Sequence, residues 1–225
     1  MGFKELFCPE AIAVFGSVSP GKLGVTFIDQ LLLNGYKNIY AINPKGASYG
    51  EVPGYKSLEE VPVRIDLALI VSPASTVAGN LEACGKAGVK DAIIISSGFS
   101  EAGNAEGEQE IVDVAKKYGI RFIGPNCAGL LNTHWNCAPT FQAYPPKGSC
   151  AIVSQSGAVG GAVTEISNFQ NMGVSKFVSY GNGADLNQVD FLRYLKDDDE
   201  TKVVAVYIEN IKNWHCVQLT HTTRT

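Results

Sequence analysis

The chain has 225 residues, of which 45% are hydrophobic and 18% are charged, and its formal net charge is -4. This length and apolar content are sufficient for one large globular domain or two of ordinary size. The small net charge and the lack of a basic stripe exclude nucleic acid and an anionic membrane as expected partners, so an anionic ligand would have to be held locally.

The N-terminus and the cysteines predict a cytoplasmic protein. The segment MGFKELFCPEAIAVFG has neither the apolar region nor the cleavage site of a secretion signal, and no run of about 18 apolar residues predicts a membrane span. The six cysteines are scattered without a CxxC pair, which is typical of reduced thiols in a reducing compartment.

The first 130 residues alternate between short β-branched apolar runs and longer amphipathic segments, a pattern typical of βαβ units and a parallel sheet. The predicted strands are 12–16, 38–43, 67–72, 92–97 and 121–124. The predicted helices are 24–34, 75–85 and 105–118. Because the strands are nearly continuous hydrophobic runs, we expect helices on both faces of this sheet.

A second α/β pattern follows a stretch rich in Pro, Asn and Gly over residues 126–148, which is predicted to be a linker or a loop between domains. The pattern predicts strands 150–154, 176–179 and 203–209, with helices 158–171 and 187–195. Three strands are few for an open parallel sheet, so we expect this second domain to be incomplete. The tail WHCVQLTHTTRT has no helical period and is expected to lie outside the native continuation of the domain.

The first strand-to-helix junction, AVFGSVSPGKLGVTF, has the composition of a phosphate-binding loop. Glycines permit close approach of the backbone, a helix N-terminus favours an anion, and hydroxyl and lysine donors lie between them. The residues that would supply these features are Gly16, Ser17, Ser19, Gly21, Lys22 and Gly24. An ordinary glycine-rich turn with a solvated lysine is the alternative, since the spacing departs from GxGxxG and Leu23 breaks the GxxxxGK[ST] pattern.

The end of the second strand discriminates between cofactors. NAD-binding proteins carry an acidic residue there, whereas this chain reads AINPKG, with Asn43 and Lys45. Lys45 could pair with a phosphate on the ribose, as in coenzyme A (CoA) or NADP, or could be a solvated turn residue. Small residues also follow three further strands, where open α/β sheets bind ligands, although turn chemistry alone favours them too. They include Ser72, Pro73, Ser97, Gly98 and Asn126.

In the second half, IVSQSGAVGGAV places Gln155, Ser156 and Gly157 at another helix N-terminus suited to an anion. The segment resembles the GxSxG nucleophile elbow only loosely, because Ser154 replaces the first glycine and no acid and histidine follow in triad order. The three histidines lack metal-ligand spacing, so no metal site is expected. His134 lies in the predicted linker and is expected at the surface.

Eight segments in order resemble the N-terminal part of nucleoside-diphosphate-forming acyl-CoA synthetases, most nearly the ADP-forming acetate–CoA ligase alpha subunit, a relative of succinyl-CoA synthetase alpha. They are FCPEAIAVFGSVSPGKLG, YAINPKG, LALIVSPAS, IIISSGFSEAG, GIRFIGPNCAGLLNT, IVSQSGAVGGAV, VSYGNGADL and VYIENIK. The resemblance implies an α/β fold: a Rossmann-like CoA-binding domain with a parallel sheet at 8–130, a linker at 131–147, a partial flavodoxin-like ligase domain at 148–213 and an atypical tail at 214–225.

The resemblance also implies roles for individual residues. Ser17, Lys22 and Lys45 would face the phosphates of CoA. Ser72, Pro73, Ser97 and Gly98 would line the rest of the cofactor, with Asn126 near its thiol. Gln155, Ser156 and Gly157 would receive a phosphorylated histidine, and Glu209 would hold the other ring nitrogen of that histidine. Cys127, beside the thiol end, is interpreted as a buried spectator.

In this family an acid, CoA and ATP are interconverted with acyl-CoA, ADP and phosphate, while ATP or ADP and Mg belong to an ATP-grasp beta subunit or fused domain. The resemblance therefore implies a small carboxylic acid as a substrate and an acid–thiol ligase as the complete enzyme. The family's phosphohistidine segment is absent from this chain, and Asn210 replaces the usual glycine after the glutamate. We therefore expect the chain alone to make no acyl-CoA. The alternatives are a stand-alone CoA-binding or sensory module and, more weakly, an NADP-dependent oxidoreductase.

Overall fold

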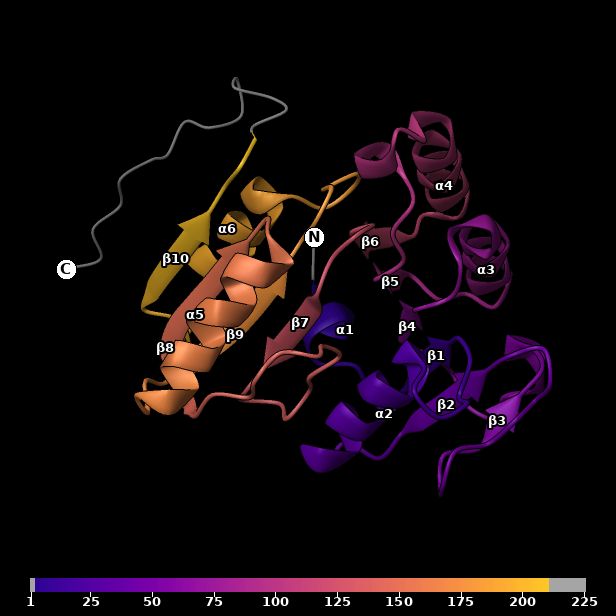
Figure 1. Cartoon of the computed structure of the whole chain (residues 1–225), viewed down its shortest axis with the longest axis horizontal. Coiled ribbons are helices and arrows are strands. Elements are labelled where there is room, and N and C mark those ends of the chain that lie inside the picture. Colours follow the sequence, from indigo (N-terminus) through magenta and orange to yellow (C-terminus); the bar gives the residue numbers. More distant parts are fainter. Residues whose placement is uncertain (1–2, 211–225) are drawn as a thin grey trace.

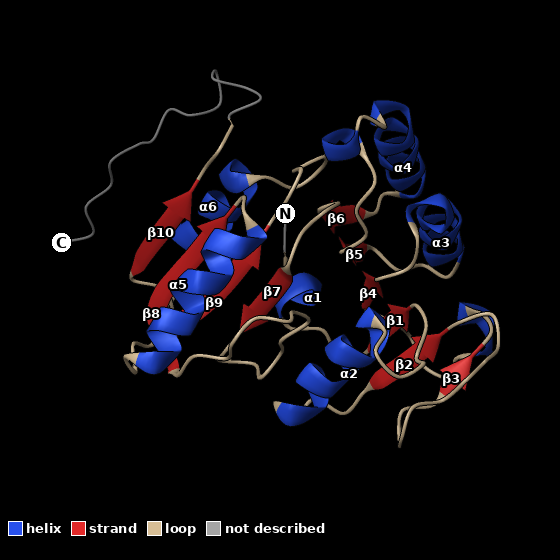
Figure 2. Ribbon diagram, viewed as in Figure 1, coloured by secondary structure: helices blue, strands red, loops and turns tan. Residues whose placement is uncertain are grey.

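The computed structural model describes residues 3–210, which form two α/β units, each built around its own sheet (Figures 1 and 2). The first sheet is parallel, with the strand order β3-β2-β1-β4-β5-β6. Its strands are β1 (Ile12–Phe15), β2 (Ile39–Ile42), β3 (Gly54–Tyr55), β4 (Leu67–Ile70), β5 (Asp91–Ile94) and β6 (Arg121–Ile123). The predicted α/β fold with a parallel sheet is confirmed, and β3 is an additional strand of two residues that lacks an apolar run.

Helices cover both faces of this sheet, as its continuous apolar strands predicted. Ile12 and Val14 of β1 belong to the same core as Phe27 of α2, whereas Ala13 and Phe15 belong to the core that contains α3 and α4. The helices are α1 (Lys4–Phe7), α2 (Leu23–Leu33), α3 (Ala74–Lys86) and α4 (Ala105–Tyr118), with 3-10 turns η1 (Leu58–Glu60) and η2 (Ser100–Ala102). Among residues 3–210, no helix combines the length and the apolar character needed to cross a bilayer.

The second unit has a mixed sheet with the order β10-β8-β9-β7, in which only β7 is antiparallel to its neighbour. Its elements are β7 (Gly129–Asn132), β8 (Lys147–Ser154), α5 (Gly157–Phe169), β9 (Val174–Ser179), α6 (Gln188–Lys196) and β10 (Val203–Tyr207). The sequence predicted three strands here and a linker at 131–147. Instead, β7 extends into that segment as a fourth strand, because the short run GLLN gains its partner only when β9 packs beside it. The predicted tail at 214–225 lies outside the described residues.

The two units are joined along β6, the edge strand of the first sheet. Three backbone N–H groups of the segment 182–186 donate to carbonyl groups at and beyond β6: Leu186 to Phe122 (3.1 Å), Ala184 to Gly124 (3.1 Å) and Asn182 to Pro125 (3.0 Å). Gly181 lies in the left-handed region (φ +55°), and a Cβ there would lie 2.2 Å from the carbonyl oxygen of Asn126. The segment VSYGNGADL therefore covers a strand edge that would otherwise be unpaired.

Candidate functional site

The carboxyl ends of β1, β2, β4 and β5 border a pocket of about 840 Å³. Ligands of open α/β sheets bind at this edge. Of the thirteen residues predicted to bind the cofactor, eleven line the pocket: Gly16, Ser17, Ser19, Gly21, Lys22, Gly24, Asn43, Lys45, Ser72, Pro73 and Ser97. The other two, Gly98 and Asn126, follow β5 and β6 and do not line it. The structure therefore brings most of the predicted set to one place and leaves these two beside it.

The glycines of the first loop allow the chain to pass close to its neighbours. Gly21 has φ +76°, which other residues rarely adopt. A Cβ at Gly24, in the first turn of α2, would lie 2.6 Å from the carbonyl oxygen of Ser17. Lys22 is the N-cap residue of α2, and because its ammonium group cannot accept a hydrogen bond, no N-cap side chain occupies the first N–H groups of this helix.

The charged residues that line the pocket in the described part of the chain are all positive. Lys22, Lys45 and Lys56 line it, and among the described residues that line it there is no aspartate or glutamate. Sequence reasoning missed Lys56, because it follows the two-residue strand β3, which has no hydrophobic pattern. Three lysines without a carboxylate favour an anionic ligand with more than one phosphate group.

Two predicted residues at strand ends are held by hydrogen bonds of their own side chains. The Asn43 amide donates to the Ala47 carbonyl and accepts from the Ala47 N–H, both at 2.9 Å, so this buried side chain shapes the turn that presents Lys45. The Ser72 hydroxyl lies 2.8 Å from the Thr76 hydroxyl and 2.9 Å from the Asn80 amide nitrogen. Thr76 and Asn80 line the pocket too, although no sequence pattern marked them.

A second predicted group lies at the carboxyl ends of β8 and β10. The Gln155 side-chain oxygen accepts from the N–H groups of Glu209 (2.9 Å) and Asn210 (3.0 Å). The Ser156 hydroxyl caps α5 by accepting from Val159 (3.3 Å), and Gly157 begins that helix. The structure therefore places Gln155, Ser156 and Gly157 beside the backbone of Glu209.

A polar pocket of about 560 Å³ adjoins this second group. It is lined by residues of α4 and α6 and also by Gln155, Tyr180 and Asn210. Burial, and then the negative charge of Glu209, raises the pKa of Tyr180 to about 12, so the Tyr180 hydroxyl remains protonated and donates to Gln155 (3.4 Å). Within residues 3–210, no group of three or more His, Cys, Asp or Glu side chains could hold a metal ion.

Cys127 is buried, and its thiol donates to the carbonyl oxygen of Ile94 (3.3 Å). Burial raises the pKa of this thiol to about 12. A protonated, enclosed thiol is a poor nucleophile, which supports its interpretation as a spectator.

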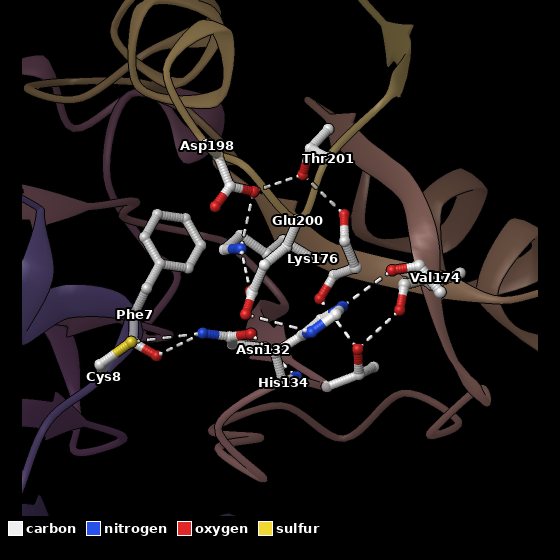
Figure 3. A network of polar contacts seen from close by, with 12 residues as sticks. Phe7, Cys8, Asn132, His134, Val174, Lys176, Asp198, Glu200 and Thr201 are labelled. Carbon is white, nitrogen blue, oxygen red and sulfur yellow. Dashed lines mark hydrogen bonds and ion pairs between the residues drawn. The ribbon is translucent and has the colours of Figure 1, made fainter.

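His134 is not the surface residue that the sequence predicted. Its Nδ1 lies 3.1 Å from a carboxylate oxygen of Glu200 and its Nε2 lies 2.9 Å from the carbonyl oxygen of Gly148. Figure 3 shows the surrounding network, in which Lys176, with only 2% of its side chain exposed, reaches Asp198 (2.7 Å) and Glu200 (3.0 Å). Sequence reasoning missed Lys176, because a lone lysine in a strand gives no signal that its partners come from a later loop.

The fold and the lysine-lined pocket define a Rossmann-like domain suited to a phosphorylated cofactor. Comparison with protein families matches residues 10–133 to the CoA binding domain and residues 147–220 to the succinyl-CoA ligase like flavodoxin domain. Because the first match spans more than half of the chain, the chain belongs to the CoA-binding domain family.

Named relatives carry both units. The ADP-forming acetate–CoA ligase of Methanocaldococcus jannaschii is 48% identical over 93% of this chain and 30% of its own length. The ADP-forming acetate–CoA ligase II alpha subunit of Pyrococcus furiosus is 44% identical over 92% of this chain and 46% of its own length. The predicted resemblance is thereby confirmed, and the chain spans less than half the length of these relatives.

A solved structure shares the same arrangement. The dinucleotide-forming acetyl-coenzyme A synthetase 1 of Candidatus Korarchaeum cryptofilum, in complex with phosphate and ADP, superposes with a TM-score of 0.91 at 40% identity. The match covers 95% of this chain and 47% of that chain. The fold of both units and their relative arrangement are therefore shared with that synthetase.

Proposed function

We propose that this chain is the CoA-binding part of an ADP-forming acyl-CoA synthetase, which interconverts acyl-CoA, ADP and phosphate with a carboxylic acid, CoA and ATP. The observation that carries the proposal is the pocket of about 840 Å³ with three lysines and no carboxylate among its described residues, inside the segment that matches the CoA-binding family. The names of the relatives support a ligase rather than a stand-alone sensory module. They do not support an NADP-dependent oxidoreductase either.

The residues present fit CoA, a cofactor with a diphosphate and a ribose phosphate. Ser17, Ser19 and Lys22 would hold the diphosphate at the start of α2. Lys45, with Lys56 beside it in the pocket, would hold the ribose phosphate. When bound, CoA supplies the thiol that captures the acyl group.

The rest of CoA, beyond its phosphates, would lie along the carboxyl ends of the strands. Ser72, Pro73 and Ser97 line the pocket at the ends of β4 and β5. Gly98 and Asn126 come next in the order of the sheet, at the ends of β5 and β6. We therefore place the thiol end of CoA toward Asn126 and the second unit.

The second unit would serve the phosphoryl-transfer step. The N-terminus of α5, with Gln155, Ser156 and Gly157, would stabilise a phosphoryl group through its amides and dipole, and Glu209 would orient the histidine that carries that group. The one histidine in residues 3–210 is His134, which contacts Glu200 and Gly148 instead. The phosphorylated histidine would therefore come from outside the described residues.

The remaining substrates would bind elsewhere in the complete cytoplasmic enzyme. An ATP-grasp partner, as a beta subunit or a fused domain, would bind ATP or ADP with Mg. A small carboxylic acid would be the acyl donor.

Calorimetric titration of the chain with CoA and with 3'-dephospho-CoA tests this proposal. We expect CoA to bind about tenfold more tightly or better, since charge-assisted contacts to one phosphate are lost with dephospho-CoA. The variant Lys45→Ala should lose this preference, whereas Lys37→Ala, at an exposed lysine outside the pocket, should keep it. No heat with CoA would overturn the proposed function. Equal affinity of the wild type for both ligands would overturn only the role of Lys45.

A further inference from the structure

Asn182, in the second unit, connects the ends of two strands of the first unit. Its side-chain nitrogen lies 2.5 Å from a Glu101 carboxylate oxygen, 2.7 Å from a Glu108 carboxylate oxygen and 3.2 Å from the Ser100 hydroxyl. Its side-chain oxygen lies 3.3 Å from the amide nitrogen of Asn126. One amide therefore contacts both the loop after β5 and the loop after β6.

The Glu101 carboxylate connects Asn182 to the backbone beside the pocket. Its second carboxylate oxygen accepts from the N–H groups of Gly98 (2.6 Å) and Phe99 (3.2 Å). Burial opposes ionisation of Glu101, but the hydrogen bonds from Asn182, Gly98 and Phe99 outweigh it and lower the pKa of the Glu101 carboxyl. The carboxylate is thus charged at neutral pH and held from two sides.

The units stay joined without the side chain of Asn182. The backbone hydrogen bonds to Phe122, Gly124 and Pro125 use main-chain groups of the segment 182–186. Asp185 adds contacts to the Arg121 side chain and the Phe122 N–H. Changing the side chain at position 182 therefore removes its contacts to Ser100, Glu101, Glu108 and Asn126 and leaves the backbone junction in place.

The order of the strands places these contacts at one end of the pocket. Lys45 follows β2 and Ser97 follows β5, with β1 and β4 between them. Strands lie about 4.8 Å apart, so the pocket runs along this edge for about 14 Å. A ligand whose phosphates are held near the lysines therefore extends toward Gly98 and Asn126.

We propose that Asn182 is a positioning residue that holds the Gly98–Glu101 loop and Asn126 where the thiol end of the cofactor lies. The inference rests on the proposed function, because it assumes that CoA occupies the pocket with its phosphates at the lysines. Asn182 acts through Glu101 and Asn126 and touches no reacting atom itself. The second unit thereby sets the geometry at the reactive end of a cofactor that the first unit binds.

Calorimetry with two ligands tests this inference on the full chain. Adenosine 3',5'-bisphosphate carries the 3'-phosphate and the first 5'-phosphate of CoA but lacks the second phosphate of the diphosphate, the pantetheine arm and its thiol. We expect Asn182→Ala to weaken CoA binding about tenfold and adenosine 3',5'-bisphosphate binding less than twofold. Asn38→Ala is the matched control, since Asn38 also bridges two segments, through the Glu10 carbonyl oxygen (2.9 Å), but lies outside the pocket. It should change neither affinity by more than about twofold.

A second pair of substitutions, at Asn182 and Glu101, tests whether CoA affinity depends on the contact between these two side chains. Asn182→Asp sets a third carboxylate against Glu101 and Glu108, so CoA affinity should fall further than in Asn182→Ala. Adding Glu101→Gln returns an amide donor to that contact while keeping an oxygen for Gly98, and should restore part of the affinity. A loss of affinity that did not arise from the charge at this contact would not respond to the second change.

Each remaining outcome overturns the inference. It is wrong if Asn182→Ala weakens both ligands equally, if it leaves CoA affinity unchanged, or if circular dichroism shows that it unfolds the chain. If the wild type binds adenosine 3',5'-bisphosphate and CoA equally, the thiol arm makes no contact and the inference fails, while the phosphate site stands. If the wild type binds neither ligand, the proposed function itself is wrong.

Discussion

Arg121 and Asp185 form an ion pair across the junction of the two units: the Arg121 Nε lies 3.0 and 2.9 Å from the two carboxylate oxygens of Asp185. One of these oxygens also accepts from the Phe122 N–H (2.8 Å). The two side chains are 32% and 23% exposed, so water screens the pair only in part. The junction therefore combines a backbone ladder with a partly buried charge contact.

Asp185→Ala should destabilise the chain by about 1–3 kcal/mol, because it leaves a partly buried guanidinium and the Phe122 N–H without this partner. Urea unfolding measures the effect. Asp113→Ala, at an exposed position of α4, is the control and should cost less than about 0.5 kcal/mol. Equal effects of the two substitutions would contradict a role of Asp185 in joining the units.

Asp91, at the start of β5, should make stability depend on pH. Burial, and then the charge of Glu5, raises the pKa of the Asp91 carboxyl to about 7, against the opposing charge of Arg121. Since the folded state holds this proton more tightly than the unfolded state, its contribution to stability is full below about pH 4 and is lost as the pH rises to about 7.

Because this pKa lies about three pH units above that of a free aspartate, the free energy of unfolding falls by about 4 kcal/mol at most between pH 4 and pH 8. Asp91→Asn should therefore be more stable than the wild type at pH 8, by about 2–4 kcal/mol, and similar to it at pH 4. Urea unfolding at several pH values measures the difference. A constant difference between pH 4 and pH 8 would show that Asp91 does not titrate in this way.

Two glycines in helices should respond in opposite ways to alanine. At Gly24 the new Cβ would meet the carbonyl oxygen of Ser17 at 2.6 Å, so the loop must shift. We expect about 1–3 kcal/mol of destabilisation and at least tenfold weaker CoA binding. At Gly79 of α3 nothing lies within 4 Å of the new Cβ, so Gly79→Ala should stabilise the chain by about 0.5–1 kcal/mol. Thermal unfolding and calorimetry test both, and unchanged CoA binding by Gly24→Ala would contradict the role of the loop.

Lys176→Met should destabilise the second unit by about 3 kcal/mol, because it leaves the carboxylates of Asp198 and Glu200 without their buried cation. Figure 3 shows these two carboxylates converging on the Lys176 amine. Lys202→Met, at an exposed lysine near the same loop, should change the free energy of unfolding by less than about 0.5 kcal/mol. If both variants unfold at the same urea concentration, the buried network does not stabilise the unit.

Local patterns in the sequence determined the first sheet and most of its pocket. The run Ile12–Phe15 is apolar at every position because helices cover both of its faces, and such a run predicts a buried parallel strand directly. Strand ends and the glycine loop are equally local, since backbone conformation depends on neighbouring residues. Parallel strands bring their carboxyl ends to one edge, so Ser17, Lys45 and Ser72 could be predicted to meet.

Contacts between distant parts of the chain were decided only by the tertiary structure. Lys176 and Glu200, Asn182 and Glu101, and β7 with β9 come together because the two units fold against each other, and no local pattern marks either partner. Thus the sequence alone determined the kind of cofactor that the first loop favours. The packing of the units determined which side chains surround the loops after β5 and β6, since hydrogen bonds and ion pairs depend on distances in space and not on spacing along the chain.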